Sequence, residues 1–289
     1  MQNARPAVRP AAVAGLFYPG TPSVLAAVVR AYLADAGSAT EASPPLPKAL
    51  IVPHAGYVYS GPVAAFAYRR IAAARASVRR VVLLGPVHRV PIRGLALPAA
   101  HTFATPLGTV AVDAEAAARA LDLPQVQVSE AAHALEHSLE VQLPFLQTVL
   151  DQFTVVPIAV GDATAVEVAQ LIDRLWGGAE TLIVVSSDLS HYHPYAAATQ
   201  IDRGTAGAIL ALDASLDHEQ ACGATPINGF ALCARRHHLD PELLDLRNSG
   251  DTAGDKSRVV GYAAFAFADP ARTGARERVE EALEPADAH

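Results

Sequence analysis

Three short, uninterrupted apolar runs most restrict how this sequence can fold. Each is rich in Val, Ile and Leu, and each is followed by a histidine: His54, His88 and His191. Continuous apolar runs of this length are typical of strands buried on both faces of a parallel sheet. Ligands of open α/β sheets bind beyond the carboxyl ends of such strands. The sequence therefore predicts three imidazole groups at one shared crevice.

Segments with helical character alternate with the apolar runs. We expect helices at residues 22–36, 62–74, 113–121, 130–149, 164–176 and 194–212, a loop at 222–227 that enters one more helix to about Arg236, and further strands at 94–97, 153–162, 243–248 and 257–267. Pro144 should kink the helix at 130–149 or mark a boundary in it. This alternation predicts an α/β fold: one domain over residues 1–269, with a central, mostly parallel or mixed sheet flanked by helices. Residues 270–289 are expected to form a flexible polar tail.

Charge and composition argue against several classes of function. The formal net charge is −7 and there is no Lys/Arg cluster, so we expect no nucleic-acid partner. No apolar run approaches the roughly 18 to 20 residues that cross a bilayer, so no membrane partner is expected either. Two cysteines in 289 residues give no disulfide framework and favour a cytoplasmic location. Motifs for nucleotide binding and serine hydrolysis are absent from the sequence.

His54, His88 and Cys222 form the first candidate site. All three are predicted to lie on loops that follow strands or precede helices. Neutral imidazole and thiolate together bind late first-row metals such as iron, copper or zinc. The structural alternative for each histidine is a hydrogen-bonded loop residue. The other cysteine, Cys233, lies inside an apolar helix and is most simply a core residue.

Asp188 and His191 form the second candidate site. If the turn that contains them opens a helix, their spacing of three places them on one face, where the carboxylate could orient the imidazole as an acid or base. The structural alternative is that Ser187 or Asp188 merely caps that helix. His193, beside a proline, is interpreted as exposed and incidental.

The segment from His133 to His137 matches the His-x-x-Glu-His pattern of inverted zinc peptidases. In that chemistry His133 and His137 would bind zinc and Glu136 would act as the base. The pattern is short, and no third ligand is evident downstream. The alternative is that His137 and Glu140 support the crevice from its second layer.

Seven blocks in order resemble the MEMO family, named for a mediator of ErbB2-driven cell motility. They are the segments 15–19, 53–61, 85–88, 105–108, 136–145, 186–192 and 222–227, which read GLFYP, PHAGYVYSG, GPVH, TPLG, EHSLEVQLPF, SSDLSHY and CGATPI. The resemblance covers roughly residues 12–267. It implies an α/β domain similar to class III extradiol dioxygenases of the LigB type.

The resemblance also implies a site. Where those dioxygenases hold ferrous iron with two histidines and a glutamate, the MEMO family has two histidines and a cysteine, here His54, His88 and Cys222. Asp188 and His191 match the remaining crevice residues. A thiolate in place of a carboxylate shifts metal preference toward copper or zinc. The loop before His88 carries Val87, where relatives usually have a polar residue. In prokaryotes the family is associated with a radical-SAM protein and an AMMECR1-like protein, so the resemblance implies these two as partners.

These observations leave three hypotheses open. The first is an iron- or copper-dependent, dioxygenase-like oxidoreductase, in which His191 with Asp188 moves a proton and His137 supports the crevice. The second is a non-catalytic module whose crevice binds a small molecule, a peptide or a partner. A zinc peptidase built on His133, Glu136 and His137 is the third.

Overall fold

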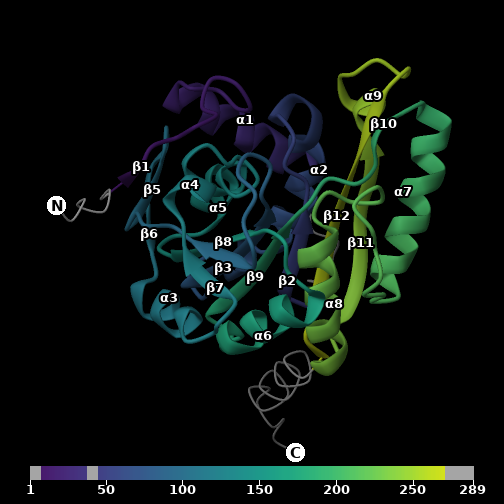
Figure 1. Cartoon of the computed structure of the whole chain (residues 1–289). Coiled ribbons are helices and arrows are strands. Elements are labelled where there is room, and N and C mark those ends of the chain that lie inside the picture. Colours follow the sequence, from purple (N-terminus) through teal and green to yellow (C-terminus); the bar gives the residue numbers. More distant parts are fainter. Residues whose placement is uncertain (1–7, 38–44, 271–289) are drawn as a thin grey trace, which may run out of the picture.

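The computed structural model describes residues 8–37 and 45–270 (Figure 1). The strands are β1 (Val8–Arg9), β2 (Pro47–Val52), β3 (Arg80–Pro86), β4 (Leu95–Leu97), β5 (Thr102–Thr105), β6 (Gly108–Val112), β7 (Val126–Val128), β8 (Thr154–Val160), β9 (Thr181–Ser186), β10 (His191–His193), β11 (Asp240–Asn248) and β12 (Val259–Ala268). The helices are α1 (Pro22–Asp35), α2 (Tyr57–Arg70), α3 (Ala114–Leu121), α4 (Glu130–Ala134), α5 (Leu143–Val149), α6 (Ala165–Leu175), α7 (Tyr195–Leu210), α8 (Ala224–Arg236) and α9 (Ser249–Thr252), with short 3-10 turns η1 (Ala72–Ala74) and η2 (Glu140–Gln142). The tail expected from residue 271 onward lies outside the described residues.

One mixed sheet runs through the molecule in the order β1-β5-β6-β8-β3-β9-β2-β12-β10, with β4, β7 and β11 paired beside this path. Its centre, β8-β3-β9-β2, is parallel, whereas β12 runs antiparallel to β2. The predicted α/β fold with a central mixed sheet is thereby confirmed. Within the described residues, no helix combines the length and apolar character needed to cross a membrane.

The apolar runs are uninterrupted because both faces of the central strands are buried. Along β3, Val81 and Leu83 pack into one core cluster, whereas Val82 and Leu84 pack into the other. Side chains alternate across a strand, so a strand covered on both sides needs apolar residues at every position. Each of these four side chains is fully buried.

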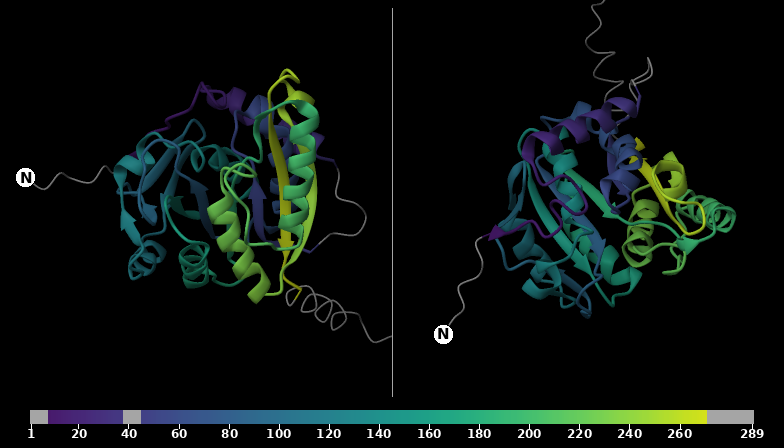
Figure 2. Two further views of the ribbon diagram at one scale, coloured as in Figure 1. Left: turned by 45° about the vertical axis from the view of Figure 1, so that its right-hand side comes forward. Right: turned by 90° about the horizontal axis from the view of Figure 1, so that it is seen from above.

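Helices supply the two covering layers (Figure 2). Apolar residues of α1, α2 and α5 belong to the first core cluster, and those of α3, α6 and α8 belong to the second. Helix α7 lies along β11 and β12 at one end of the sheet, where it also contacts β10. Beyond the carboxyl ends of β3 and β8, residues such as His88 and Asp162 line a cavity.

The second helix begins earlier than predicted. We expected it to start at Pro62, but α2 starts at Tyr57, whose N–H donates to the carbonyl of Phe17 at 2.7 Å. Pro62 therefore lies inside the helix, where it lacks the N–H that would bond the carbonyl of Val58. Val58 is 56% exposed, so water can reach that turn of the helix.

The prediction of a single helix over residues 130–149 was also wrong. Helix α4 ends at Ala134, an irregular turn follows, and α5 begins only at Leu143. The cause is Glu136, whose carboxylate accepts the N–H groups of His137 and Ser138 at 2.9 Å each and so replaces helical hydrogen bonds. Pro144 lies in the first turn of α5, so the boundary expected near this proline is confirmed.

Candidate metal centre

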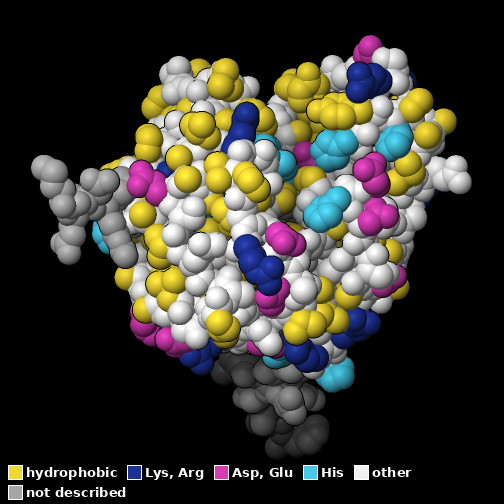
Figure 3. Space-filling view, viewed as in Figure 1, with side chains coloured by type: hydrophobic (Ala, Val, Ile, Leu, Met, Phe, Trp, Pro, Cys, Tyr) yellow, Lys and Arg dark blue, Asp and Glu magenta, His cyan; other side chains and the backbone are white. Residues whose placement is uncertain are grey.

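Parallel pairing brings the predicted histidines to one edge of the sheet. His54 follows β2, His88 follows β3 and Asp188 follows β9, and these three strands are in register through β9. The space-filling view shows histidine side chains gathered at a hollow between two lobes (Figure 3). Cys222 does not follow a central strand but lies on the loop that enters α8. Two of the three predicted histidines thus meet at this edge, with the ring centroids of His54 and His88 5.2 Å apart.

His54 is held so that one ring nitrogen is occupied and the other is free. Its Nδ1 lies 2.9 Å from the hydroxyl oxygen of Ser186. That hydroxyl donates to the carbonyl of Ser138 at 2.6 Å and accepts from Nε2 of Gln142 at 2.8 Å. With its proton already committed, the hydroxyl can only accept from His54, which places the imidazole proton on Nδ1. The lone pair of Nε2 consequently faces Cys222, whose Sγ lies 3.3 Å away.

The orientation of Gln142 supports this assignment. Its Oε1 accepts from the hydroxyl of Tyr68 at 2.8 Å, and its Nε2 also donates to the carbonyl of Pro53 at 2.9 Å. A flipped amide would lose both bonds. Burial lowers the pKa of His54 well below its ordinary value, and the neighbouring His137 adds to this effect. The imidazole of His54 is therefore neutral, the form that binds metals.

His88 is oriented in the same way by a different partner. Its Nδ1 lies 2.9 Å from Oε1 of Glu136, and its backbone N–H donates to Oε2 at 2.6 Å. Burial would raise the pKa of Glu136, but the hydrogen bonds from His88 and Ser138 outweigh it and lower that pKa to about 2. An ionised carboxylate only accepts hydrogen bonds, so Nδ1 of His88 carries the proton and Nε2 is free.

Cys222 is positioned by a close contact between two loops. The N–H of Gly223 donates to the hydroxyl of Ser187 at 2.9 Å, and a Cβ on Gly223 would lie 2.6 Å from that of Ser187. Glycine is therefore required directly after the cysteine. Burial, with a further contribution from Asp188, raises the pKa of the Cys222 thiol to about 12.

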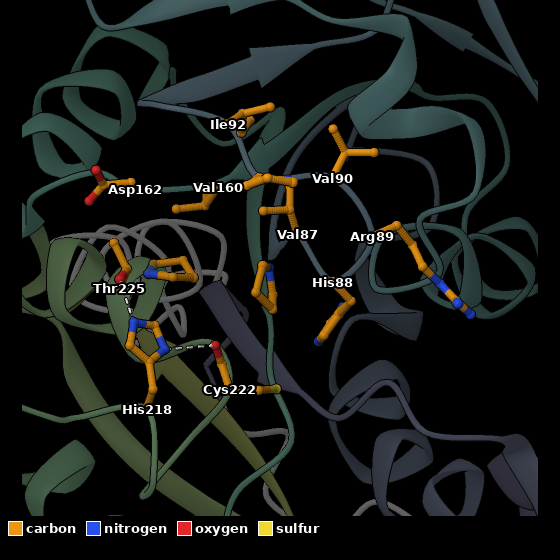
Figure 4. Close-up of a pocket in the computed structure, with 14 residues that line it drawn as sticks. Val87, His88, Arg89, Val90, Ile92, Val160, Asp162, His218, Cys222 and Thr225 are labelled. Atoms are coloured by element: carbon orange, nitrogen blue, oxygen red, sulfur yellow. Dashed lines mark hydrogen bonds between the residues drawn. The ribbon is translucent and has the colours of Figure 1, made fainter.

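Three donor atoms converge at this point. One ligand atom each from His54, His88 and Cys222 lie within 4.8 Å of one another. In the close-up, the side chains of His88 and Cys222 extend toward each other across the site (Figure 4). The structure thus brings together the residues predicted as the metal set, and they could hold one metal ion.

Residues 136–142, referred to below as the relay segment, orient both histidines. Glu136 at its start bonds His88, and Ser138 and Gln142 bond the Ser186 hydroxyl that orients His54. Partners that fix the tautomer and direction of an imidazole are typical of metal-ligating histidines. All four partners lie in blocks quoted in the sequence analysis, 136–145 and 186–192, but none of them was predicted to orient a histidine.

The predicted catalytic residues are only partly arranged as expected. His137 lies against the metal set, with its ring centroid 4.6 Å from that of His88 and 5.4 Å from that of His54. The turn after β9 does not open a helix, because His191 begins β10 instead. Asp188 accordingly pairs with His54, accepting its backbone N–H at 2.7 Å, rather than orienting His191. Burial raises the pKa of Asp188 to about 7.

A second group that could hold a metal consists of His88, Glu136 and His137. The Glu136 carboxylate, however, already accepts four N–H groups, from His88 (backbone and ring), His137 and Ser138. It is therefore better suited to orient His88 than to bind an ion. His133 lies apart from this group, since its Nε2 bonds the carbonyl of Ala96 at 2.9 Å in the core. With α4 ending at Ala134, His133 and His137 do not share a helix face, contrary to the peptidase pattern.

Comparison with known proteins identifies the family. The model of the family described as Memo-like protein matches residues 9–266 of the chain. The chain belongs to the Memo-like family. A MEMO1 family protein of Ignicoccus hospitalis is 37% identical over 91% of this chain and 99% of its own length. Those of Sulfolobus acidocaldarius and Aquifex aeolicus are 35% and 36% identical, covering 91% and 90% of this chain and 100% and 99% of their own.

A solved structure shares the fold of this Memo-like chain. It is the crystal structure of an uncharacterized protein from Escherichia coli K12, which covers 75% of this chain and 98% of its own with a TM-score of 0.50. The two sequences are 16% identical, so the likeness concerns the fold alone.

Beside the metal set, this Memo-like protein has a cavity of about 500 Å³. His88 and Cys222 form part of its wall, together with residues that were not predicted as site residues: Val90, Ile92, Val160, Asp162, His218, Thr225 and others. His218 is held by contacts of 3.3 Å with the carbonyl of Cys222 and with the hydroxyl of Thr225 (Figure 4). A usable signal for Asp162 was its place two residues after the end of the buried strand β8, which pairs with β3.

Proposed function

We propose that this protein binds one iron or copper ion through His54, His88 and Cys222 and uses it in a redox reaction on a small molecule. The observation that carries the proposal is the convergence of three donor atoms, two of them on imidazoles whose other nitrogen is already bonded. Ligation by two neutral imidazoles and one thiolate suits late first-row metals, with zinc as the redox-inert alternative.

The chain's own residues would contribute binding and proton transfer. When bound, iron or copper would supply electron transfer and the capacity to bind oxygen. The adjacent cavity would hold the small molecule, with Val90, Ile92 and Val160 excluding water from its wall. Burial, with a smaller contribution from the nearby His88, lowers the pKa of His191. A neutral His191 would accept a proton, and His137 would pack against the ligands.

A non-catalytic binding module is the second candidate, and the same cavity supports it. Its size suits a small molecule better than a folded partner. Binding of an aromatic or carboxylate-bearing peptide by the metal-free protein, without oxygen consumption by the metal-loaded protein, would favour this candidate.

Purification without oxygen and without a metal-binding tag should yield close to one iron or copper ion per chain, measured by elemental analysis. Protein stripped with a chelator should take up one equivalent of ferrous or cuprous ion, because the site is formed by the fold. A protein that contains no metal and takes up neither ion would rule out the oxidoreductase and leave the crevice as a binding site.

A further inference from the structure

A buried ion pair ties the amino-terminal strand to the relay segment. Arg9 in β1 is 4% exposed, and its partner Glu140 is completely buried. Strand β1 is held at the sheet edge by parallel pairing with β5, and the guanidinium of Arg9 lies 5.1 Å from the ring centroid of Phe103. The arginine therefore projects from a fixed position in the sheet.

The guanidinium bonds three groups at once. Its Nη1 pairs with the Glu140 carboxylate, its Nε donates to the carbonyl of His133 at 2.9 Å, and its Nη2 donates to the carbonyl of Glu136 at 2.5 Å. We refer to Arg9 and Glu140 as the clamp. Both carbonyls lie where α4 ends; that of His133 also accepts the backbone N–H of Glu136 at 3.3 Å, and the arginine supplies a further, charged donor to each carbonyl. The fork of five N–H groups on arginine fits this arrangement, and a lysine would not.

Glu140 anchors the clamp from the other side. Besides Arg9, its carboxylate accepts the N–H groups of Ala12 and Val13 at 2.7 and 3.0 Å and the hydroxyl of Tyr18 at 2.5 Å. The segment that follows β1 is thereby fixed to the relay segment.

Stability alone is a weak reason for such a pair. Buried ion pairs are often replaceable by apolar residues of similar volume without loss of stability, because desolvation offsets the attraction. The clamp does, however, fix the backbone of Glu136, and the Glu136 carboxylate contacts both the ring and the backbone of His88. A shift of this backbone would move the carboxylate away from the imidazole.

We infer that Arg9, with Glu140, is a positioning residue for the metal site: it fixes Glu136 and thereby the tautomer and direction of His88. The inference rests on the proposed function in taking His88 as a metal ligand. Its consequence for the free protein, a single His88 tautomer set by the clamp, does not depend on metal.

The test compares the full-length wild type with the double variant Arg9→Met/Glu140→Gln, which removes both buried charges together. Affinity for Co²⁺, followed through the thiolate charge-transfer band, is expected to fall about 10- to 100-fold, as for loss of other groups that orient a ligand. In metal-free protein, ¹⁵N spectra of the imidazoles should show His88 as the Nδ1–H form in wild type and as a mixture in the variant.

A matched control is Arg80→Met/Asp113→Asn, which removes an ion pair of 2.7 Å at the amino end of β3, the end opposite His88. It should lower the unfolding midpoint but leave Co²⁺ affinity and the His88 tautomer unchanged. The same pattern in the clamp variant would overturn the inference. If the double variant does not fold, Arg9→Lys, which keeps Glu140 paired, serves in its place. Wild type that takes up no Co²⁺ would contradict the proposed function. The His88 tautomer in the metal-free proteins would then still show whether the clamp orients His88.

Discussion

Replacing Cys222 with serine, or His54 or His88 with alanine, is expected to lower metal affinity by at least about 1,000-fold, more than the 10- to 100-fold typical for loss of an orienting partner. Each substitution removes one of three converging donor atoms. Serine in place of Cys222 keeps the shape of the side chain but replaces a thiolate with a poorly coordinating hydroxyl. Isothermal titration of chelator-stripped protein with ferrous or cuprous ion measures the change.

Two matched substitutions control for burial. Cys233→Ser alters a fully buried cysteine whose Sγ contacts the carbonyl of Ala169 in the core, away from the site. His133→Ala removes a buried imidazole that bonds Ala96. Both should leave metal affinity unchanged in the folded protein. Loss of metal in His133→Ala would contradict the assignment and revive the peptidase pattern.

Glu136→Gln is expected to produce the second large effect, on both affinity and stability. The carboxylate receives four N–H groups, and a glutamine of the same size presents its own NH₂ to some of them. The unsatisfied donors should destabilise the fold by about 3 kcal/mol, and loss of the His88 contact should weaken metal binding about 10- to 100-fold.

Denaturant unfolding and metal titration separate these two consequences. Glu167→Gln is the matched control, because that carboxylate also accepts a backbone N–H, from Thr164 at 2.7 Å, but lies at the start of α6 on the surface. It should cost little stability and no affinity. Unchanged affinity in Glu136→Gln would show that the carboxylate does not orient His88.

The sequence was a good guide to the sheet and to the convergence of ligands. Runs such as 81–84 can be recognised as strands because a strand covered on both faces needs apolar residues at every position. Parallel strands also place their carboxyl ends at the same edge of the sheet. The order of those strands then brings His54 and His88 together. Cys222 was included because of its place on a loop before a helix, and the family resemblance then supported it; no local pattern shows that it lies beside the two histidines, because that depends on the fold.

Features that depend on long-range hydrogen bonds could not be predicted. Residues 130–149 have helical composition. Only the fold shows that the Glu136 carboxylate bonds the ring and backbone of His88 and that the chain leaves the helical conformation there. Asp188 and His191 have helical spacing, but pairing of His191 with Val260 of β12 extends the chain instead. The role of Arg9 could not be predicted from the sequence, because its hydrogen-bond partners His133, Glu136 and Glu140 lie more than 120 residues away along the chain.

X-ray absorption at the metal edge of the iron- or copper-loaded protein tests the central claim most directly. We predict one sulfur neighbour at about 2.3 Å and two imidazole nitrogens at about 2.0 to 2.1 Å, with the sulfur contribution lost in Cys222→Ser and kept in Cys233→Ser. A metal surrounded only by nitrogen and oxygen in the wild-type protein would contradict the account, because Cys222 would then not be a ligand.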